Sequence, residues 1–183
     1  MIDQTLPGSS ITLVASNPNE STGANMEVIS DDPSINTLSS LTLRVITGIP
    51  LKPLSSVEIT IPSNFGVDSI TGVSTLGGYL EPNPVWSFNA QTRTLNVQKI
   101  NLIYLDTRES LYIVVSKVKN PSQTSPTQSF YYQLLDPNNF PIEFVGEGIL
   151  FTATAGGFGD ISVSASEKLI NKLDVEYTFT MRP

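Results

Sequence analysis

Acidic side chains are the residues of this sequence with the most varied potential chemistry. Two carboxyl groups about 5–10 Å apart in a cleft can hydrolyse a glycosidic bond. The acids that could form such a pair are Glu143, Glu147, Asp160 and Asp174. No motif ties these four acids to one cleft, and any β protein brings some carboxylates together by chance. We therefore expect no catalytic residues and no enzymatic activity.

A second group of acids, Asp31 and Asp32 with Glu27 nearby, could coordinate Ca²⁺, which takes several oxygen ligands. The spacing of these acids matches no EF-hand loop. A solvated turn in which Asp prepares the bend at Pro33 explains the same residues. Asp31 and Asp32 are therefore weak metal candidates, and we expect no cofactor.

Histidine and cysteine are both missing from the 183 residues. Their absence excludes Ser–His and Cys–His nucleophiles and removes the commonest metal ligand. It also excludes a disulfide framework and zinc–thiolate sites.

Aromatic residues could form a platform on which a sugar ring stacks. The candidates are Trp86, Phe88, Tyr131 and Tyr132. Aromatic side chains at strand spacing more often belong to a core, so the core interpretation takes precedence over the platform.

Two lysines on a predicted strand, Lys117 and Lys119, could crosslink to Asn, as lysines do in bacterial surface adhesins. A strand lysine more often faces solvent. Asn19-Glu20-Ser21 is a glycosylation acceptor if the protein is secreted, although a chance match explains it equally well in so Asn-rich and Ser-rich a chain.

The net charge limits the classes of partner. Seventeen acidic and ten basic residues give a net charge of −7, which repels nucleic acid and anionic lipid. No apolar run is long enough to span a membrane as a helix. The low charged fraction of 15%, with abundant Ser, Thr, Asn and Pro, is typical of secreted and cell-surface β proteins, so we expect an extracellular location.

The elements that must position these residues are β-strands. The chain is organised around residues 111–144, where an apolar strand at 111–118 is followed by a connection with two prolines and an aromatic hairpin. β-Branched and aromatic runs between Pro, Asn and Ser are typical of strands. Ten or so such runs, with turns every 8–12 residues, predict an antiparallel, immunoglobulin-like β-sandwich.

The alternating pattern also predicts which side chains form the core and how the sheets connect. We expect residues 120–127 to cross from one sheet to the other, since Pro121 and Pro126 favour an extended path. The predicted core residues are Leu43, Val45, Ile59, Ile61, Trp86, Ile113, Val115, Phe130 and Tyr132.

Two pairs of segments are similar to each other along the chain. LTLRVITGIP at 41–50 is similar to VEYTFTMRP at 175–183, and ITLVAS at 11–16 is similar to ISVSAS at 161–166. Self-similarity at so long a spacing indicates a string of whole domains. The order IPL..LSSVEITIPSNF, a WxF hairpin and VVSKVKNPSQTSPTQSF then resembles the tandem β-sandwich repeats of very large cell-surface proteins of ciliate protists. This resemblance implies an extracellular structural array.

These similarities divide the chain into three parts. Residues 1–25 are expected to be a leader and the end strand of a preceding unit, 26–166 the main sandwich, and 167–183 a terminal strand that could start the next repeat. We expect a structural module of a filament, coat or adhesive stalk whose neighbouring copies associate through terminal strands. The alternative is an adhesion module that binds glycans or requires calcium. The predicted assembly residues are Val175, Tyr177, Phe179 and Met181.

Overall fold

The structure, a computed structural model, describes residues 25–156, 160–166 and 175–182. These residues form an all-β structure of eleven strands, which pair antiparallel. No helix among these residues has the length and apolarity to cross a membrane. The strands are β1 (Asn25–Ser30), β2 (Leu38–Ile46), β3 (Ser56–Thr60), β4 (Gly72–Leu76), β5 (Val85–Asn89), β6 (Thr94–Gln98), β7 (Ser110–Lys119), β8 (Tyr131–Leu135), β9 (Pro141–Val145), β10 (Asp160–Ala165) and β11 (Tyr177–Arg182).

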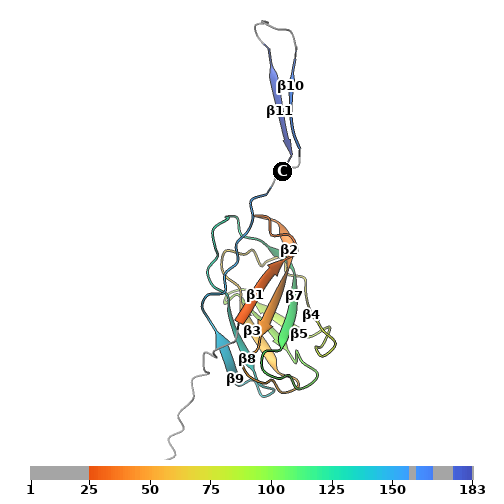
Figure 1. Cartoon of the computed structure of the whole chain (residues 1–183), viewed down its shortest axis with the longest axis vertical. Coiled ribbons are helices and arrows are strands. Elements are labelled where there is room, and N and C mark those ends of the chain that lie inside the picture. Colours follow the sequence, from red (N-terminus) through yellow and green to blue (C-terminus); the bar gives the residue numbers. More distant parts are fainter. Residues whose placement is uncertain (1–24, 157–159, 167–174, 183) are drawn as a thin grey trace, which may run out of the picture.

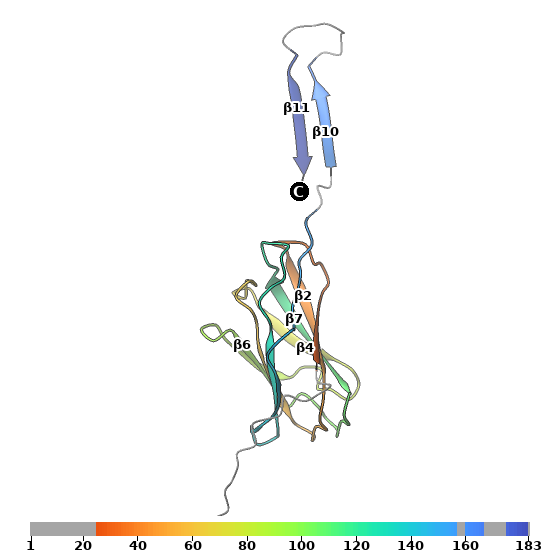
Figure 2. The ribbon, with the colours of Figure 1, turned by 60° about the vertical axis from the view of Figure 1, so that its left-hand side comes forward.

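Two main sheets face each other across the core (Figure 2). One has the strand order β1-β2-β7-β4, and the other has the order β5-β6-β3-β8-β9. In β2, Leu41, Leu43 and Val45 are fully buried, while the residues between them are half exposed. This period of two lets each sheet bury one face and show the other to water, which gives a sandwich-like architecture.

The predicted core is confirmed with one exception. Eight of the nine predicted residues are buried, whereas Trp86 is only partly buried and packs against the edge of the core. The reason is its position on β5, an edge strand that has a neighbour on one side only. The buried eight are Leu43, Val45, Ile59, Ile61, Ile113, Val115, Phe130 and Tyr132.

The predicted connection between the sheets is also confirmed. β7 lies inside the first sheet and β8 inside the second, so the segment that joins them crosses the sandwich. Asn120 is buried where the crossing begins, and its side-chain amide donates to the carbonyls of Asp32 and Ser34. The Thr127 N–H donates to the Phe151 carbonyl, which fixes the far part of the crossing.

The last two strands form a hairpin of their own. β10 pairs with β11 and with neither main sheet, although the sequence pattern places residues 161–165 in the main sandwich. The hairpin projects from one end of the sandwich (Figure 1). That end is the one where β1 ends and β2 begins, since Ser34 bridges to Thr154 just before the hairpin.

The described chain therefore runs from one end of the sandwich to the other. Asn25 lies beside Ile46, at the end of the sandwich opposite the hairpin. Ile46 in turn pairs with Ser110, the first residue of β7. The leader, the Ile11–Ser16 segment and the glycosylation acceptor Asn19 lie outside the described residues.

Candidate functional site

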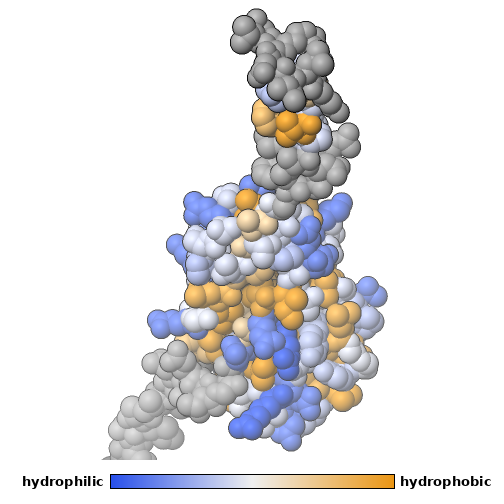
Figure 3. Space-filling view, turned by 45° about the horizontal axis from the view of Figure 1, so that its top comes forward, coloured by the Kyte–Doolittle hydropathy of each residue, from blue (hydrophilic) through white to orange (hydrophobic). Residues whose placement is uncertain are grey.

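The projecting hairpin carries an exposed apolar face. Val163 lies directly opposite Phe179, and Ala165 lies opposite Tyr177. Positions two apart on a strand share a face, so these four side chains form one surface. Val163, Tyr177 and Phe179 are 57%, 61% and 66% exposed, and apolar side chains are visible on the hairpin surface (Figure 3). Exposed apolar faces of this kind mark interaction surfaces.

The opposite face of the hairpin is polar. Thr178 pairs with Ser164, and Thr180 pairs with Ser162. All four are exposed hydroxyl residues. The hairpin is thus amphipathic in the manner of a strand pair with one buried face, although nothing among the described residues covers that face.

The predicted assembly residues fall on or beside this face. Tyr177 and Phe179 contribute directly, Met181 is in register with Ile161, and Val175 precedes the strand and is half buried. The alternating pattern located β11 in the sequence. The pairing of β11 with β10 was not predicted, because periodicity indicates a face and not a neighbour.

The outer face of the second sheet carries a row of connected polar side chains. The Glu58 carboxylate accepts hydrogen bonds from Asn96 Nδ2 at 2.8 Å and Gln133 Nε2 at 3.0 Å. Tyr131 Oη donates to Gln133 Oε1 at 3.2 Å. An open depression of about 400 Å³ adjoins this row and is lined by Glu58, Ser87, Asn89, Thr92, Thr94 and Asn96.

The aromatic residues that could have stacked on a sugar do not share one face. Tyr132 is fully buried, and Trp86 and Phe88 pack against the core. Tyr131 alone faces outward, and its ring stacks on Phe144 with 6.2 Å between centroids. The outward aromatic pair is therefore Tyr131 with Phe144, which the sequence analysis did not select.

The four acids considered as a catalytic pair lie in different environments. Glu143 is fully buried, where its Oε2 accepts the Gly48 N–H at 2.8 Å and its Oε1 accepts the Tyr132 hydroxyl at 3.2 Å. Burial raises the pKa of Tyr132, and the Glu143 charge adds to the rise. The two hydrogen bonds of Glu143 connect β9 and β8 to the end of β2. Glu147 is exposed and Asp160 lies in the hairpin, while Asp174 lies outside the described residues.

Asp31 and Asp32 act as turn residues. The Asp31 carboxylate accepts the Ser40 N–H, and the Asp32 carboxylate accepts the Ser34 N–H. The hydrogen bond from Ser34 lowers the pKa of Asp32. Among the described residues, no group of three or more potential metal-ligating His, Cys, Asp or Glu side chains occurs. The turn interpretation accounts for both acids.

The two strand lysines follow the solvent-facing interpretation. Lys117 and Lys119 are both exposed. The Lys119 N–H donates to the Gly66 carbonyl at 2.8 Å, and the Gly66 N–H donates to the Lys119 carbonyl at 2.9 Å. A Cβ on Gly66 would lie 2.9 Å from the Lys119 Cβ, so this close approach requires glycine.

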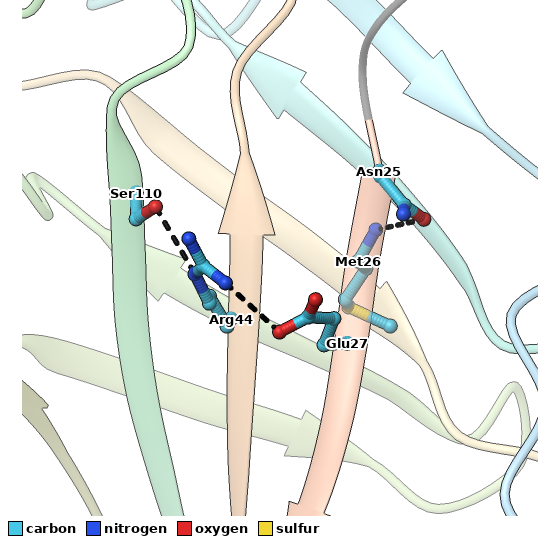
Figure 4. Close-up of polar contacts among 5 residues, drawn as sticks. All are labelled: Asn25, Met26, Glu27, Arg44 and Ser110. Atoms are coloured by element: carbon cyan, nitrogen blue, oxygen red, sulfur yellow. Dashed lines mark hydrogen bonds and ion pairs between the residues drawn. The ribbon is translucent and has the colours of Figure 1, made fainter.

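The outer face of the first sheet carries one ion pair, shown in Figure 4. Arg44 on β2 donates to Glu27 on β1 at 3.0 Å and to the Ser110 hydroxyl on β7 at 3.2 Å. Its guanidinium also lies 5.8 Å from the centre of the Tyr112 ring. The hydrogen bond to Glu27 raises the pKa of Arg44. Arg44 thus connects three neighbouring strands on the solvent side.

No protein-family model matches the chain, and the curated proteins contain no significant relative of it.

Proposed function

We propose that this chain is a structural, extracellular module of a repetitive filament, coat or adhesive stalk, and that neighbouring modules associate end to end through terminal strands. The partners are further copies of the module, and the module carries out no catalysis. We also propose that the strands of the sandwich have an immunoglobulin-like arrangement. The resemblance to ciliate cell-surface repeats and the sparsely charged composition support the extracellular location.

One observation carries the proposal: an amphipathic hairpin stands outside the sandwich with its apolar face exposed. A two-stranded hairpin is marginally stable in water by itself. Its free strand edges and apolar face gain stability when another chain segment covers them. The hairpin and the start of β1 lie at opposite ends of the sandwich, which suits a linear arrangement of modules.

Sedimentation velocity over a concentration series tests the association. We expect the chain to self-associate as concentration rises, and Phe179→Asp to abolish the association because it places a charge on the apolar face. Thr178→Asp is the matched control on the polar face and leaves association intact. Deletion of residues 174–183 should remove association while the sandwich stays folded. A wild-type chain that remains monomeric at every concentration contradicts the proposal.

A second candidate function is glycan binding on the outer face of the second sheet. The observation that favours it is the hydrogen-bonded row of Glu58, Asn96 and Gln133 beside the stacked rings of Tyr131 and Phe144. Carboxylate and amide groups can bind sugar hydroxyls, while an aromatic ring can cover the apolar face of a sugar.

Titration of the ¹⁵N-labelled chain with neutral oligosaccharides tests this alternative. Binding there would shift the amide signals of β3, β6 and β8 in a saturable manner, and Glu58→Gln would weaken it. Glu147→Gln changes an exposed acid elsewhere and is the control. Signals that stay unchanged at millimolar oligosaccharide contradict glycan binding and leave the structural role unaffected.

A further inference from the structure

The projecting hairpin repeats the pairing of the first hairpin of the sandwich. In β1–β2, Asn25–Ser30 pairs with residues 41–46, and in β10–β11, Asp160–Ala165 pairs with Tyr177–Arg182. Each hairpin contains six pairs of facing residues, and each pair of the first hairpin has a matching pair at the same place in the second. The matching pairs are Met26–Val45 with Ile161–Met181, Val28–Leu43 with Val163–Phe179, and Ser30–Leu41 with Ala165–Tyr177.

The turn of each hairpin is closed by the same two hydrogen bonds. In the first hairpin, the Asp31 N–H donates to the Ser40 carbonyl, and the Ser40 N–H donates to the Asp31 carboxylate at 2.8 Å. In the second, the Ser166 N–H donates to the Glu176 carbonyl, and the Glu176 N–H donates to the Ser166 hydroxyl at 3.1 Å. A side-chain oxygen at the corresponding position thus satisfies the corresponding amide in both turns. Antiparallel pairing alone does not require this bond.

The two hairpins also place apolar residues on the same face. In the first, this face carries Leu41, Leu43 and Val45, all fully buried in the core. In the second, the corresponding face includes Tyr177 and Phe179, which are exposed. The other face carries Thr42 in the first hairpin and Thr178 at the matching position in the second. In the first hairpin this face also includes the exposed Ile29.

Two elements cover the first hairpin, and the described part of the chain places neither of them against the second. β7 pairs along the free edge of β2, with Ile113 opposite Leu43 and Val115 opposite Leu41. The second sheet then closes over the apolar face. Within the described residues, β11 has no strand along its second edge. An open edge and an uncovered apolar face therefore occur together on the hairpin whose pairing matches β1–β2.

We propose that β10–β11 is the opening hairpin of a second sandwich of the same kind, and that the strands corresponding to β3–β9 of that second module cover it. This inference rests on the proposed function and identifies the partner of the hairpin. The β2–β7 contact inside the chain is the template for the interface. A strand of the β7 type would pair antiparallel with β11 and place apolar residues opposite Tyr177, Phe179 and Met181.

Extending the chain tests the inference directly. A second copy of residues 48–156 is joined after Pro183, so that β11 leads into it as β2 leads into the first copy. Because the chain has no cysteine, Phe179→Cys provides a unique thiol that reports on the apolar face. We expect its reaction with a thiol reagent to slow by roughly two orders of magnitude in the extended chain, as for a site exposed only by unfolding. Thr178→Cys, on the polar face, should change less than tenfold.

A transplanted hairpin gives a second measurement. Residues 160–182 replace residues 25–46 in front of residues 47–156, and we expect a single cooperative unfolding transition with amide protection in β7. The inference is overturned if the appended segment stays unfolded, if Phe179→Cys remains as reactive as in the unextended chain, or if the transplant does not fold. Self-association of the unextended chain is a separate result. An extended chain that folds, beside an unextended chain that stays monomeric, would support the hairpin assignment and contradict association between separate copies.

Discussion

The β1–β2 and β10–β11 hairpins have the same pairing but different surroundings. The first has β7 along one edge and the second sheet over its apolar face, so Leu43 is fully buried. Among the described residues, the second has neither, and Phe179 at the matching position is 66% exposed. Pairing between two strands is therefore a local property of the hairpin, whereas burial depends on the rest of a module.

This difference separates two sources of stability. Backbone pairing and turn hydrogen bonds each contribute modestly, because the unfolded chain forms equivalent bonds with water. Burying an apolar side chain contributes about 1.5–3 kcal/mol. The first hairpin is stabilised by hydrogen bonds and by buried apolar side chains, whereas the second is stabilised by its hydrogen bonds alone. The sandwich and the projecting hairpin should therefore respond very differently to matched substitutions.

The largest expected difference is between Leu43→Ala and Phe179→Ala. Leu43 is fully buried, so Leu43→Ala leaves a cavity in the core, and we expect a loss of about 2–5 kcal/mol. Phe179→Ala removes an exposed side chain and should change the stability of the sandwich by less than about 0.5 kcal/mol. Urea denaturation of both variants measures the two values. Equal losses would contradict the separation between sandwich and hairpin.

The next-largest effect is expected at the hydrogen bonds that join Tyr132, Glu143 and Gly48 and hold the end of β2. Tyr132 donates to Glu143, whose other oxygen accepts the Gly48 N–H just after β2. Tyr132→Phe removes one hydrogen bond and should cost about 1 kcal/mol at neutral pH. Chemical denaturation measures this loss, and Tyr177→Phe in the hairpin is the control.

Tyr132 should also make the folded protein less stable at alkaline pH. Burial raises the pKa of Tyr132 above its usual value of about 10. The folded state then keeps the proton after the unfolded state has released it, so stability falls as pH rises above about 10. The slope reaches at most about 1.4 kcal/mol per pH unit for one group. Denaturation midpoints between pH 9 and 11 should fall less steeply in Tyr132→Phe, and an unchanged slope would exclude Tyr132 as the cause.

Much of the sandwich could be predicted from the sequence, because strands with one buried face alternate. Leu43 and Val45 on β2 and Ile113 and Val115 on β7 follow this rule, and all four are buried. The proline-containing crossing was predictable for the same kind of local reason. Such features depend on residues near each other in the chain.

Other features depended on cross-strand neighbours and were not predictable. In β9, the alternating pattern favours Phe144 inside and Glu143 outside, whereas Glu143 is buried and Phe144 half exposed. An irregularity in the β8–β9 register at Leu134–Leu135 leaves Glu143 opposite the buried Leu134. The Glu58 row and the pairing of β10 with β11 were missed for the same reason, since single-strand periodicity does not identify a partner.

A smaller effect is expected at the two turns. Asp31→Ala and Ser166→Ala each remove the side-chain oxygen that accepts a turn amide, of Ser40 and Glu176 respectively. Asp31→Ala should destabilise the sandwich by about 0.5–1.5 kcal/mol. Ser166→Ala should leave the sandwich unchanged and accelerate hydrogen exchange at the Glu176 amide. Hydrogen exchange by NMR, with urea denaturation, measures both. Destabilisation of the sandwich by Ser166→Ala would show that the hairpin unfolds together with it.

The smallest expected effect is on the solvent side of the two hairpins. Glu27 and Arg44 form an ion pair on β1–β2, and Ser162 and Thr180 occupy the matching positions on β10–β11. The side chains of Arg44 and Glu27 are 34% and 47% exposed, so water and salt weaken their attraction. Arg44→Thr copies the residue of the projecting hairpin into the sandwich. We expect a small fall in the urea midpoint at low salt that disappears within error at 1 M salt.

A large fall that persists at high salt would mean that Arg44 stabilises the sandwich through its contacts with Ser110 and Tyr112 instead of through charge. In that case the solvent face of β2, and not only its buried face, would distinguish a hairpin inside a sandwich from one that stands alone.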